Sequence, residues 1–364
     1  MIGLKRNFHK NLCYKYSPYH VSVNLFFTIK QIRLRFVPLQ PMSNLLFRPF
    51  DRYNFSESVC YLTGDPSISK ITVFPEWLIK QYKLEDKPFK MLDERILTYT
   101  DITVPASEIA IAKLELLEIE IRNAFNSGYE AVSQLDELKL FQWMAKQVYG
   151  IIHWEVRAGI RQQRAMGEDF NFSQSIAHKF SNLHIMLQSL VQEMEFEGIL
   201  PWSIKVFPLK NAPETFSYRD EINTLVFSLK MNDFGIVACL QDNGESLSYH
   251  KSILDKIGNS TLHPVQYEEV CARFFYSAYL FNRLPEYTVL SANGIIYIDA
   301  MPLRISSRPV YDTWQGKTYG QVLENFWKAW GFTLFEIIKD PDHPMSFLLN
   351  EEGDFNNTVD LPLQ

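Results

Sequence analysis

The chain has 364 residues, enough for one large domain or two modest ones. Hydrophobic residues make up 46% and charged residues 21%, which is typical of a folded globular protein and excludes collagenous, low-complexity and wholly disordered chains. No uncharged apolar run approaches the roughly 18 residues that cross a bilayer. We therefore expect a soluble protein without a membrane partner.

Charge divides the chain into two unlike parts. Residues 1–41 hold seven bases and no acid, so the remainder holds 36 − 7 = 29 bases against 42 acids, a net charge of −13. The bases of this leader are Lys5, Arg6, Lys10, Lys15, Lys30, Arg33 and Arg35. Because no small-residue cleavage site follows its short apolar stretch, a secretory signal is not indicated. We expect the leader to be disordered or not part of the native chain, with Met42 as the start of the folding unit.

The four cysteines predict a cytoplasmic protein. Cys13, Cys60, Cys239 and Cys271 lack paired short spacings, so they do not indicate a disulfide framework. Cys239 lies in an apolar strand-like run and Cys271 on an apolar helix face, where buried thiols are ordinary core residues.

The first half of the folding unit changes from loops to helices. Residues 42–105 have short apolar runs separated by turn formers, which predicts a loop-rich module. Helical periodicity then predicts helices over 108–125, from 133 to about 164, and from about 173 to 194. In the first helix the residues near the 3.6-residue period are Ile109, Ala112, Leu116, Ile119 and Phe125.

The second half predicts strands and helices together. β-Branched and aromatic residues predict strands at 203–207, 222–229, 234–240, 286–290 and 294–300, the last four forming two hairpins. Helices are expected at 246–257, 266–283 and 318–330. Because hairpins dominate over crossover connections, the fold class is α+β with an antiparallel C-terminal sheet. The expected parts are a module over 42–130, a helical section over 131–200, an α+β domain over 201–350 and a frayed tail over 351–364.

Three segments of the module carry a recognisable layout. They are Val-Cys-Tyr-Leu-Thr-Gly at 59–64, Ile-Thr-Val-Phe-Pro-Glu-Trp-Leu at 71–78, and Thr-Val-Pro-Ala-Ser at 103–107, which leads into a helix. Over about residues 55–125 this resembles the HNH endonuclease family. In one branch of that family two Cys pairs flank an acid–His dipeptide and a Phe-Pro-x-Trp-Leu run. The resemblance implies a structural zinc held by the Cys pairs, and a His that activates water beside a divalent metal.

The residues that would perform this chemistry are replaced. Cys60 stands at the first ligand position, but Thr63, Ser107 and Ala110 stand at the other three, and Ile71-Thr72 stands at the acid–His dipeptide. One thiolate cannot form a tetrahedral zinc site, and a threonine hydroxyl does not titrate near neutral pH. What survives is framework: Phe74, Pro75, Trp77, Leu78, Pro105 and the acidic helix from Glu108. The resemblance therefore implies a degenerate copy without metal or other cofactor and without catalytic residues.

One cationic stripe is the candidate binding site. His153, Arg157, Arg161 and Arg164 fall at i, i+4, i+8 and i+11, so on a continuous helix they share a face that offers forked donors to an anion. The alternative is a solvated charged face, balanced by nearby acids such as Glu155 and Glu168. The acidity of the rest of the chain weakens a nucleic-acid interpretation.

Other polar residues have structural explanations. His178 and His184 are six apart and point to different helix faces, so a metal pair is not indicated. His250 and His263 are expected at caps or in solvent, and Glu115 and Glu118 on a solvated acidic face. Dinucleotide, P-loop, nucleophile-elbow and Cys-x-x-Cys motifs are absent from the sequence. Clustered aromatics such as Phe274-Phe275-Tyr276 are expected in the core.

Three functions stay open at this stage. The first is a non-catalytic binding or interaction protein on an HNH-like scaffold, contacting nucleic acid or another anionic partner through the arginines. The second is an active metal-dependent HNH-type endonuclease whose ligands the pattern does not reveal. The third is a structural protein that forms homo-oligomers through aromatic surfaces.

Overall fold

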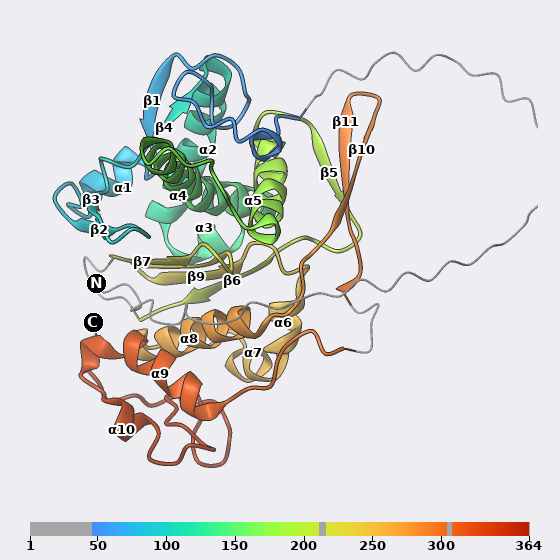
Figure 1. The fold of residues 1–364 in the computed structure, drawn as a ribbon. Coiled ribbons are helices and arrows are strands. Elements are labelled where there is room, and N and C mark those ends of the chain that lie inside the picture. The colour runs from blue at the N-terminus through green and yellow to red at the C-terminus, as the bar shows by residue number, and fades with distance from the viewer. Residues whose placement is uncertain (1–45, 211–215, 304–307, 364) are drawn as a thin grey trace, which may run out of the picture. The chain divides into compact units, whose positions relative to one another are not determined.

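The computed structural model describes residues 46–210, 216–303 and 308–363, and these group into one compact unit with an α+β fold (Figure 1). The predicted leader, residues 1–41, and Met42 lie outside the described residues. The N-terminal elements are the 3-10 helix η1 (Pro49–Asp51), β1 (Ser69–Thr72), α1 (Glu76–Gln81), β2 (Pro88–Lys90), β3 (Ile96–Thr98) and β4 (Thr103–Ala106). They are short and joined by loops, as the turn formers predict.

The helical section follows. It comprises α2 (Glu108–Ser127), α3 (Tyr129–Ser133), α4 (Glu137–Ala165), α5 (Gln174–Leu187) and η2 (Gln188–Leu190). The helix starts follow local chemistry, because the side chains of Ser107 and Asp136 accept backbone N–H groups at the starts of α2 and α4. Most of α4 is buried, so it forms the centre of the larger hydrophobic core.

The C-terminal half mixes strands and helices. Its elements are β5 (Met194–Glu197), β6 (Ser203–Pro208), β7 (Phe216–Glu221), β8 (Val226–Met231), β9 (Phe234–Cys239), α6 (Glu245–Tyr249), α7 (Lys251–Ile257), α8 (Pro264–Leu280), β10 (Tyr287–Ala292), β11 (Ile295–Ala300), α9 (Gly316–Phe326), η4 (Lys328–Trp330) and α10 (Leu334–Ile337). Both predicted hairpins form, as β8–β9 and β10–β11.

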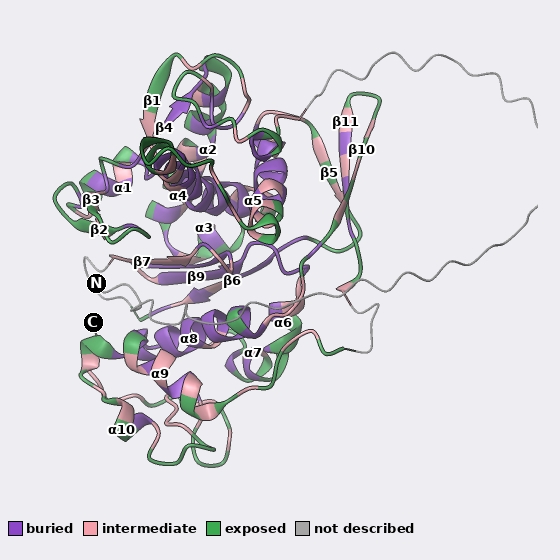
Figure 2. Ribbon diagram, viewed as in Figure 1, coloured by how far each residue is buried: buried purple, intermediate pink, exposed green. Residues whose placement is uncertain are grey.

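A four-stranded antiparallel sheet in the order β6-β9-β8-β7 separates two hydrophobic cores. Alternate residues point to opposite faces. Phe227, Leu229 and Ile236 join the core around α4, whereas Val226 and Val237 join the core around α8. Strands β8 and β9 are buried along their whole length (Figure 2).

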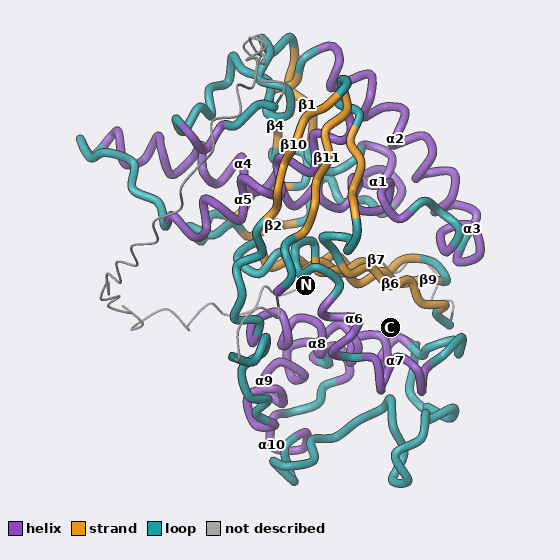
Figure 3. The backbone as a smooth tube through the Cα atoms, turned by 90° about the vertical axis from the view of Figure 1, so that its right-hand side faces the viewer, coloured by secondary structure: helices purple, strands orange, loops and turns teal. Residues whose placement is uncertain are grey.

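The remaining sheets are smaller. Strands β1 and β4 pair antiparallel, as do β2 and β3. In the third sheet, β10-β11-β5, the outer strand β5 pairs parallel with β11, with Met194 opposite Ile296. This parallel pairing adds a non-local element to the predicted hairpin, and Figure 3 shows the three strands side by side.

The tail differs from expectation. Residues 351–363 were expected to fray, but Phe355, Val359 and Leu361 pack against the core around α8. The Leu361 carbonyl lies 2.9 Å from Nε2 of His263, which also caps α8. In the described parts of the chain no helix is long and apolar enough to span a membrane.

Candidate functional site

The four residues that the HNH resemblance would assign to zinc ligands, Cys60, Thr63, Ser107 and Ala110, lie together in the fold. Cys60 and Thr63 sit in a tight turn that closes at Gly64, whose positive φ of 78° suits glycine. The Tyr61 amide donates to Pro105 O on β4 at 2.9 Å, which holds this turn beside the start of α2. Ser107 and Ala110 occupy that start. Residues 44 positions apart in sequence are therefore neighbours.

Hydrogen bonds link this cluster. The Thr63 hydroxyl lies 3.1 Å from the Ser107 hydroxyl, and the Thr63 amide donates to Cys60 Sγ at 3.5 Å. Ser107 Oγ also accepts the Ala110 amide at 3.4 Å. Burial alone would raise the pKa of the Cys60 thiol, but hydrogen bonds with Ser107 and Thr63 outweigh it, so the pKa lies below its usual value.

These residues do not fit a metal ion. One thiol, two hydroxyls and a methyl group cannot replace four zinc ligands. Across the described residues, no group of three or more His, Cys, Asp or Glu side chains is arranged to hold a metal. Thr72, which the resemblance would align with the catalytic His, ends β1 opposite Thr103 and offers only a hydroxyl. The structure thus brings the expected positions together without the residues that metal chemistry requires.

The residues that the resemblance treats as framework, Phe74, Trp77 and Leu78, hold α1 against α2. Phe74 and Leu78 are fully buried, and Trp77 Nε1 donates to Glu118 at 2.9 Å. Trp143 Nε1 and Lys146 Nζ, both on α4, donate to the same carboxylate at 3.2 and 2.6 Å. The expectation that Glu118 lies on a solvated face is therefore wrong, because its carboxylate joins α1, α2 and α4.

The predicted cationic stripe does not form a single exposed face. His153 is 1% exposed and contacts the rings of Phe55 and Tyr61, and burial holds its pKa well below the usual value. Arg157 is 5% exposed, whereas Arg161 and Arg164 reach solvent. The stripe runs from the core to the surface because α4 is buried on all sides before its last turns. His153 therefore cannot contact an anion at the surface, as the stripe predicted. Arg157 is also not part of a solvated charged face, which was the alternative.

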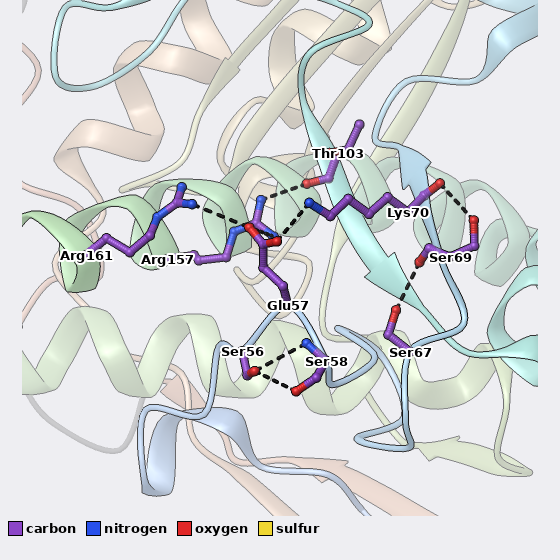
Figure 4. Close-up of polar contacts among 9 residues, drawn as sticks. All are labelled: Ser56, Glu57, Ser58, Ser67, Ser69, Lys70, Thr103, Arg157 and Arg161. Atoms are coloured by element: carbon purple, nitrogen blue, oxygen red, sulfur yellow. Dashed lines mark hydrogen bonds and ion pairs between the residues drawn. The ribbon is translucent and has the colours of Figure 1, made fainter.

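Arg157 and Arg161 instead belong to a cluster that sequence reasoning missed. Lys70 on β1 donates to Glu57 at 2.8 Å, and Arg161 and Arg157 approach the same carboxylate at 3.4 and 3.8 Å (Figure 4). Three cations thus surround one acid, a local charge of +2. We call Glu57, Lys70, Arg157 and Arg161 the Glu57 cluster. The hydrogen bond from Lys70 and the charge of Arg157 hold the pKa of Glu57 below its usual value.

Arg157 has unused donors within this cluster. Its Nη2 donates to Thr103 O on β4 at 3.1 Å, which fixes the guanidinium beside the end of β1. Its Nε and Nη1 are buried, and neither has a hydrogen-bond partner among the described residues. Buried polar groups are usually satisfied. Nη1 is the atom that lies 3.8 Å from Glu57, so it forms a long ion pair without a hydrogen bond. A buried cation with two nitrogens that lack hydrogen-bond partners, next to half-exposed Lys70 and Arg161, could donate to an anion.

A surface hollow adjoins the cluster. Its lining comprises Ala158, Arg161 and Gln162 of α4 and Asp93 and Arg95 from the loop between β2 and β3. Arg161 lines both the hollow and the Glu57 cluster. The guanidinium of Arg95 lies over the Trp154 ring at 5.0 Å from its centroid. Arg95 also pairs with Asp93, so these two residues add no net charge to the hollow.

The other histidines have structural partners. Buried His184 places Nε2 2.9 Å from Tyr61 O, and His178 lies 3.1 Å from the side-chain nitrogen of Asn182. His250 is buried with Nε2 2.9 Å from Ser277 Oγ, so the expectation of a cap or solvent exposure fails for it. His263 caps α8 as expected. No two of these side chains form a metal pair.

Comparison with known proteins gives no relatives: the chain matches no family model, no curated protein and no solved structure.

Proposed function

We propose that this chain is a non-catalytic binding protein on an HNH-like scaffold, and that it contacts an anionic group of its partner through Lys70, Arg157 and Arg161. The observation that carries the proposal is the buried Arg157 guanidinium, whose Nε and Nη1 lack hydrogen-bond partners among the described residues. An anion beside it would accept from a preorganised fork, with Lys70 and Arg161 at the rim.

The proposal of an HNH-like scaffold is supported by how close four residues lie to one another. Four positions that the family uses for zinc lie within one hydrogen-bonded cluster, although they come from a turn and a helix start far apart in sequence. The non-catalytic part rests on residue chemistry. Thr72 cannot act as a base at neutral pH, and the cluster offers a single thiol.

Glu57 is the internal competitor for the anion. Its carboxylate lies 3.4 and 3.8 Å from the two guanidinium groups, so these ion pairs are long. The Glu57 side chain is 48% exposed, so it can rotate away into solvent. An incoming phosphate group can then accept hydrogen bonds from Nε and Nη1 of Arg157. Because residues 42–364 carry a net charge of −13, the attraction is local and strongly weakened by salt.

The test is the binding of a fluorescein-labelled single-stranded oligonucleotide by Arg161→Gln, Lys70→Gln and Glu57→Gln variants at 50–200 mM salt. Removing a phosphate-contacting cation should weaken binding and lower the slope of log affinity against log salt by about 1. Glu57→Gln should strengthen binding, because it removes the competing charge. Lys251→Gln is the control, since Lys251 pairs with Asp255 on the exposed side of α7. Affinities and slopes equal to those of the control in all variants would reject the site.

A hydrolysis assay tests the non-catalytic part. The full chain, incubated with DNA and Mg²⁺ or Mn²⁺, is expected to leave the DNA intact. Cleavage that disappears on changing a side chain within residues 55–125 would show an active nuclease and overturn this part of the proposal.

A further inference from the structure

The helix α2 has two apolar faces, and only one of them is used inside the described part of the chain. Its buried face consists of Ala110, Leu114, Leu117, Ile121 and Phe125. A second row consists of Ile109, Ala112, Leu116 and Ile119. At 100° per residue this row lies roughly opposite the buried face. Ile109, Leu116 and Ile119 are 56%, 64% and 50% exposed, so large aliphatic side chains face solvent along three turns.

The spacing of the exposed row is that of a helix seam. Its members stand at i, i+3, i+7 and i+10, which is the a/d pattern by which two helices pack side by side. Isolated exposed aliphatic residues are ordinary, but a continuous row of them marks an interaction surface. Figure 3 shows α2 at the outer edge of the view.

We infer that this face of α2 binds the same face of a second copy of the chain, with the two helices antiparallel. The charged residues on either side of the apolar row favour a second copy of the chain as the binding partner. With Leu116 packed against the partner's Ile119, Glu115 lies opposite the partner's Arg122, and Lys113 lies opposite the partner's Glu120. The twofold axis repeats both pairs, so four attractive contacts flank the apolar centre.

The neighbouring register is disfavoured by the same charges. Packing Ile109 against the partner's Ile119 would bury all four members of the row, but it would place Glu115 against the partner's Glu115 and Lys113 against the partner's Lys113. The favoured register instead centres the contact on Leu116 and Ile119 and leaves Ile109 at its polar end. Glu115 and Arg122 have no salt bridge to another residue that the structure describes, so they are available to a partner. Glu120 already pairs with Lys139 through two contacts, and it would share that charge across the interface.

The dimer should be weak. A helix of 20 residues is about 30 Å long at 1.5 Å per residue, and a contact of one helix per copy is at the small end of protein interfaces. We therefore expect a dimer that dissociates in the micromolar range.

Sedimentation equilibrium of the full chain over 1–200 µM tests the inference. The wild type should shift from monomer to dimer, and Leu116→Glu should stay monomeric at every concentration. Phe335→Glu is the matched control, because Phe335 is 82% exposed on α10, away from this seam. A monomeric wild type, or equal dimerisation of the Leu116→Glu and control variants, would overturn the inference.

Charge reversal tests the register. Glu115→Arg and Arg122→Glu should each raise the dimer dissociation constant by about tenfold, and the double variant should restore it, because the pair is rebuilt with its signs exchanged. Circular dichroism checks that these surface variants keep the fold. A double variant as weak as the single variants would contradict the antiparallel pairing.

Discussion

Glu269 shows what a single buried charge contributes to this molecule. It is fully buried on α8 and accepts from Arg273 Nη2 at 3.0 Å. Ser346 Oγ and the amides of Phe347 and Leu348 donate to the same carboxylate at 2.8, 2.7 and 3.1 Å. One side chain therefore ties the C-terminal segment to the centre of the second core.

Removing this carboxylate should strongly destabilise the fold. Glu269→Ala leaves Arg273 and the Phe347 amide without their acceptor, and breaking a buried pair from one side costs about 3–5 kcal/mol. Urea denaturation measures the free energy of unfolding. Asp255→Ala is the control, because it removes one partner of an exposed pair and should cost less than about 1 kcal/mol. Equal losses would mean that the Glu269 contacts add nothing to stability.

Buried histidines should make stability fall in mild acid. Burial lowers the pKa of His184 to about 4 and that of His250 to about 3. Below the unfolded pKa of about 6.5, the unfolded chain takes up protons that the folded chain refuses, so stability falls from about pH 6.5 downward. Each histidine should contribute a loss of order 2 kcal/mol between pH 7 and pH 5. Urea unfolding of His250→Asn at both pH values should show a smaller loss than the wild type.

Asp242 provides the opposite control. Burial raises its pKa to about 6, although Ser246 and Ser203 donate hydrogen bonds to it. The folded state therefore binds the extra proton between the unfolded pKa of about 3.9 and pH 6, which stabilises the fold as the pH falls through that range. Asp242→Asn should enlarge the loss between pH 7 and pH 5. An unchanged loss would show that the carboxyl titrates in the usual range.

At the scale of elements, the contact between the central sheet and α8 depends on one glycine. The Tyr267 hydroxyl lies 2.7 Å from both Leu229 O and Ile236 O, and its ring lies where a Cβ at Gly235 would be. Gly235→Ala must displace the ring or the strand, at a cost of about 1–3 kcal/mol. Gly159→Ala in α4 meets only Phe170 at 3.4 Å and should be neutral or slightly stabilising. Thermal denaturation of the two variants compares them directly.

The turn at 60–64 and the start of α2 allow a direct test of the scaffold. Thr63→Cys, Ser107→Cys and Ala110→Cys combined place three thiols beside Cys60. If the positions correspond to those of the family, this variant should bind one Co²⁺ or Zn²⁺ per chain with thiolate-to-cobalt absorption. The same variant with Cys60→Ser is the control and should bind much more weakly. A folded quadruple-cysteine chain that binds no metal would make the correspondence accidental.

Helices and strands with strong local patterns could be predicted from the sequence. Which face of a helix is buried was harder to predict. The helix of residues 108–125 forms as α2. Of the predicted row, Phe125 is buried, but Ile109, Ala112, Leu116 and Ile119 are exposed, and Leu114, Leu117 and Ile121 are buried instead. Two apolar rows occupy this helix, and periodicity alone cannot tell which one meets α4. Strand β7 was also missed, because polar Ser217, Arg219 and Asp220 conceal its pairing with β8.

At the scale of the whole molecule, the candidate site depends on long-range packing. Glu57 comes from a loop, Lys70 from β1 and Arg157 from α4, and the last lies about a hundred residues from the first. The helical spacing of the arginines was visible in the sequence, but the acid at their centre gave no local signal. From the sequence alone, an arginine such as Arg157 is expected at the surface. Its burial follows from the packing of other elements around α4, so it could not be predicted either.

The parallel pairing of β5 with β11 fixes an order of events during synthesis. Met194 finds its neighbour Ile296 only after about a hundred further residues have left the ribosome, which takes about 5–20 s at 5–20 residues per second. During that interval the edge of β5 that later pairs with β11 has no neighbouring strand. A nascent chain halted before β11 has left the ribosome should therefore expose this second strand edge to chaperones, whereas one halted after β11 has emerged and paired should not.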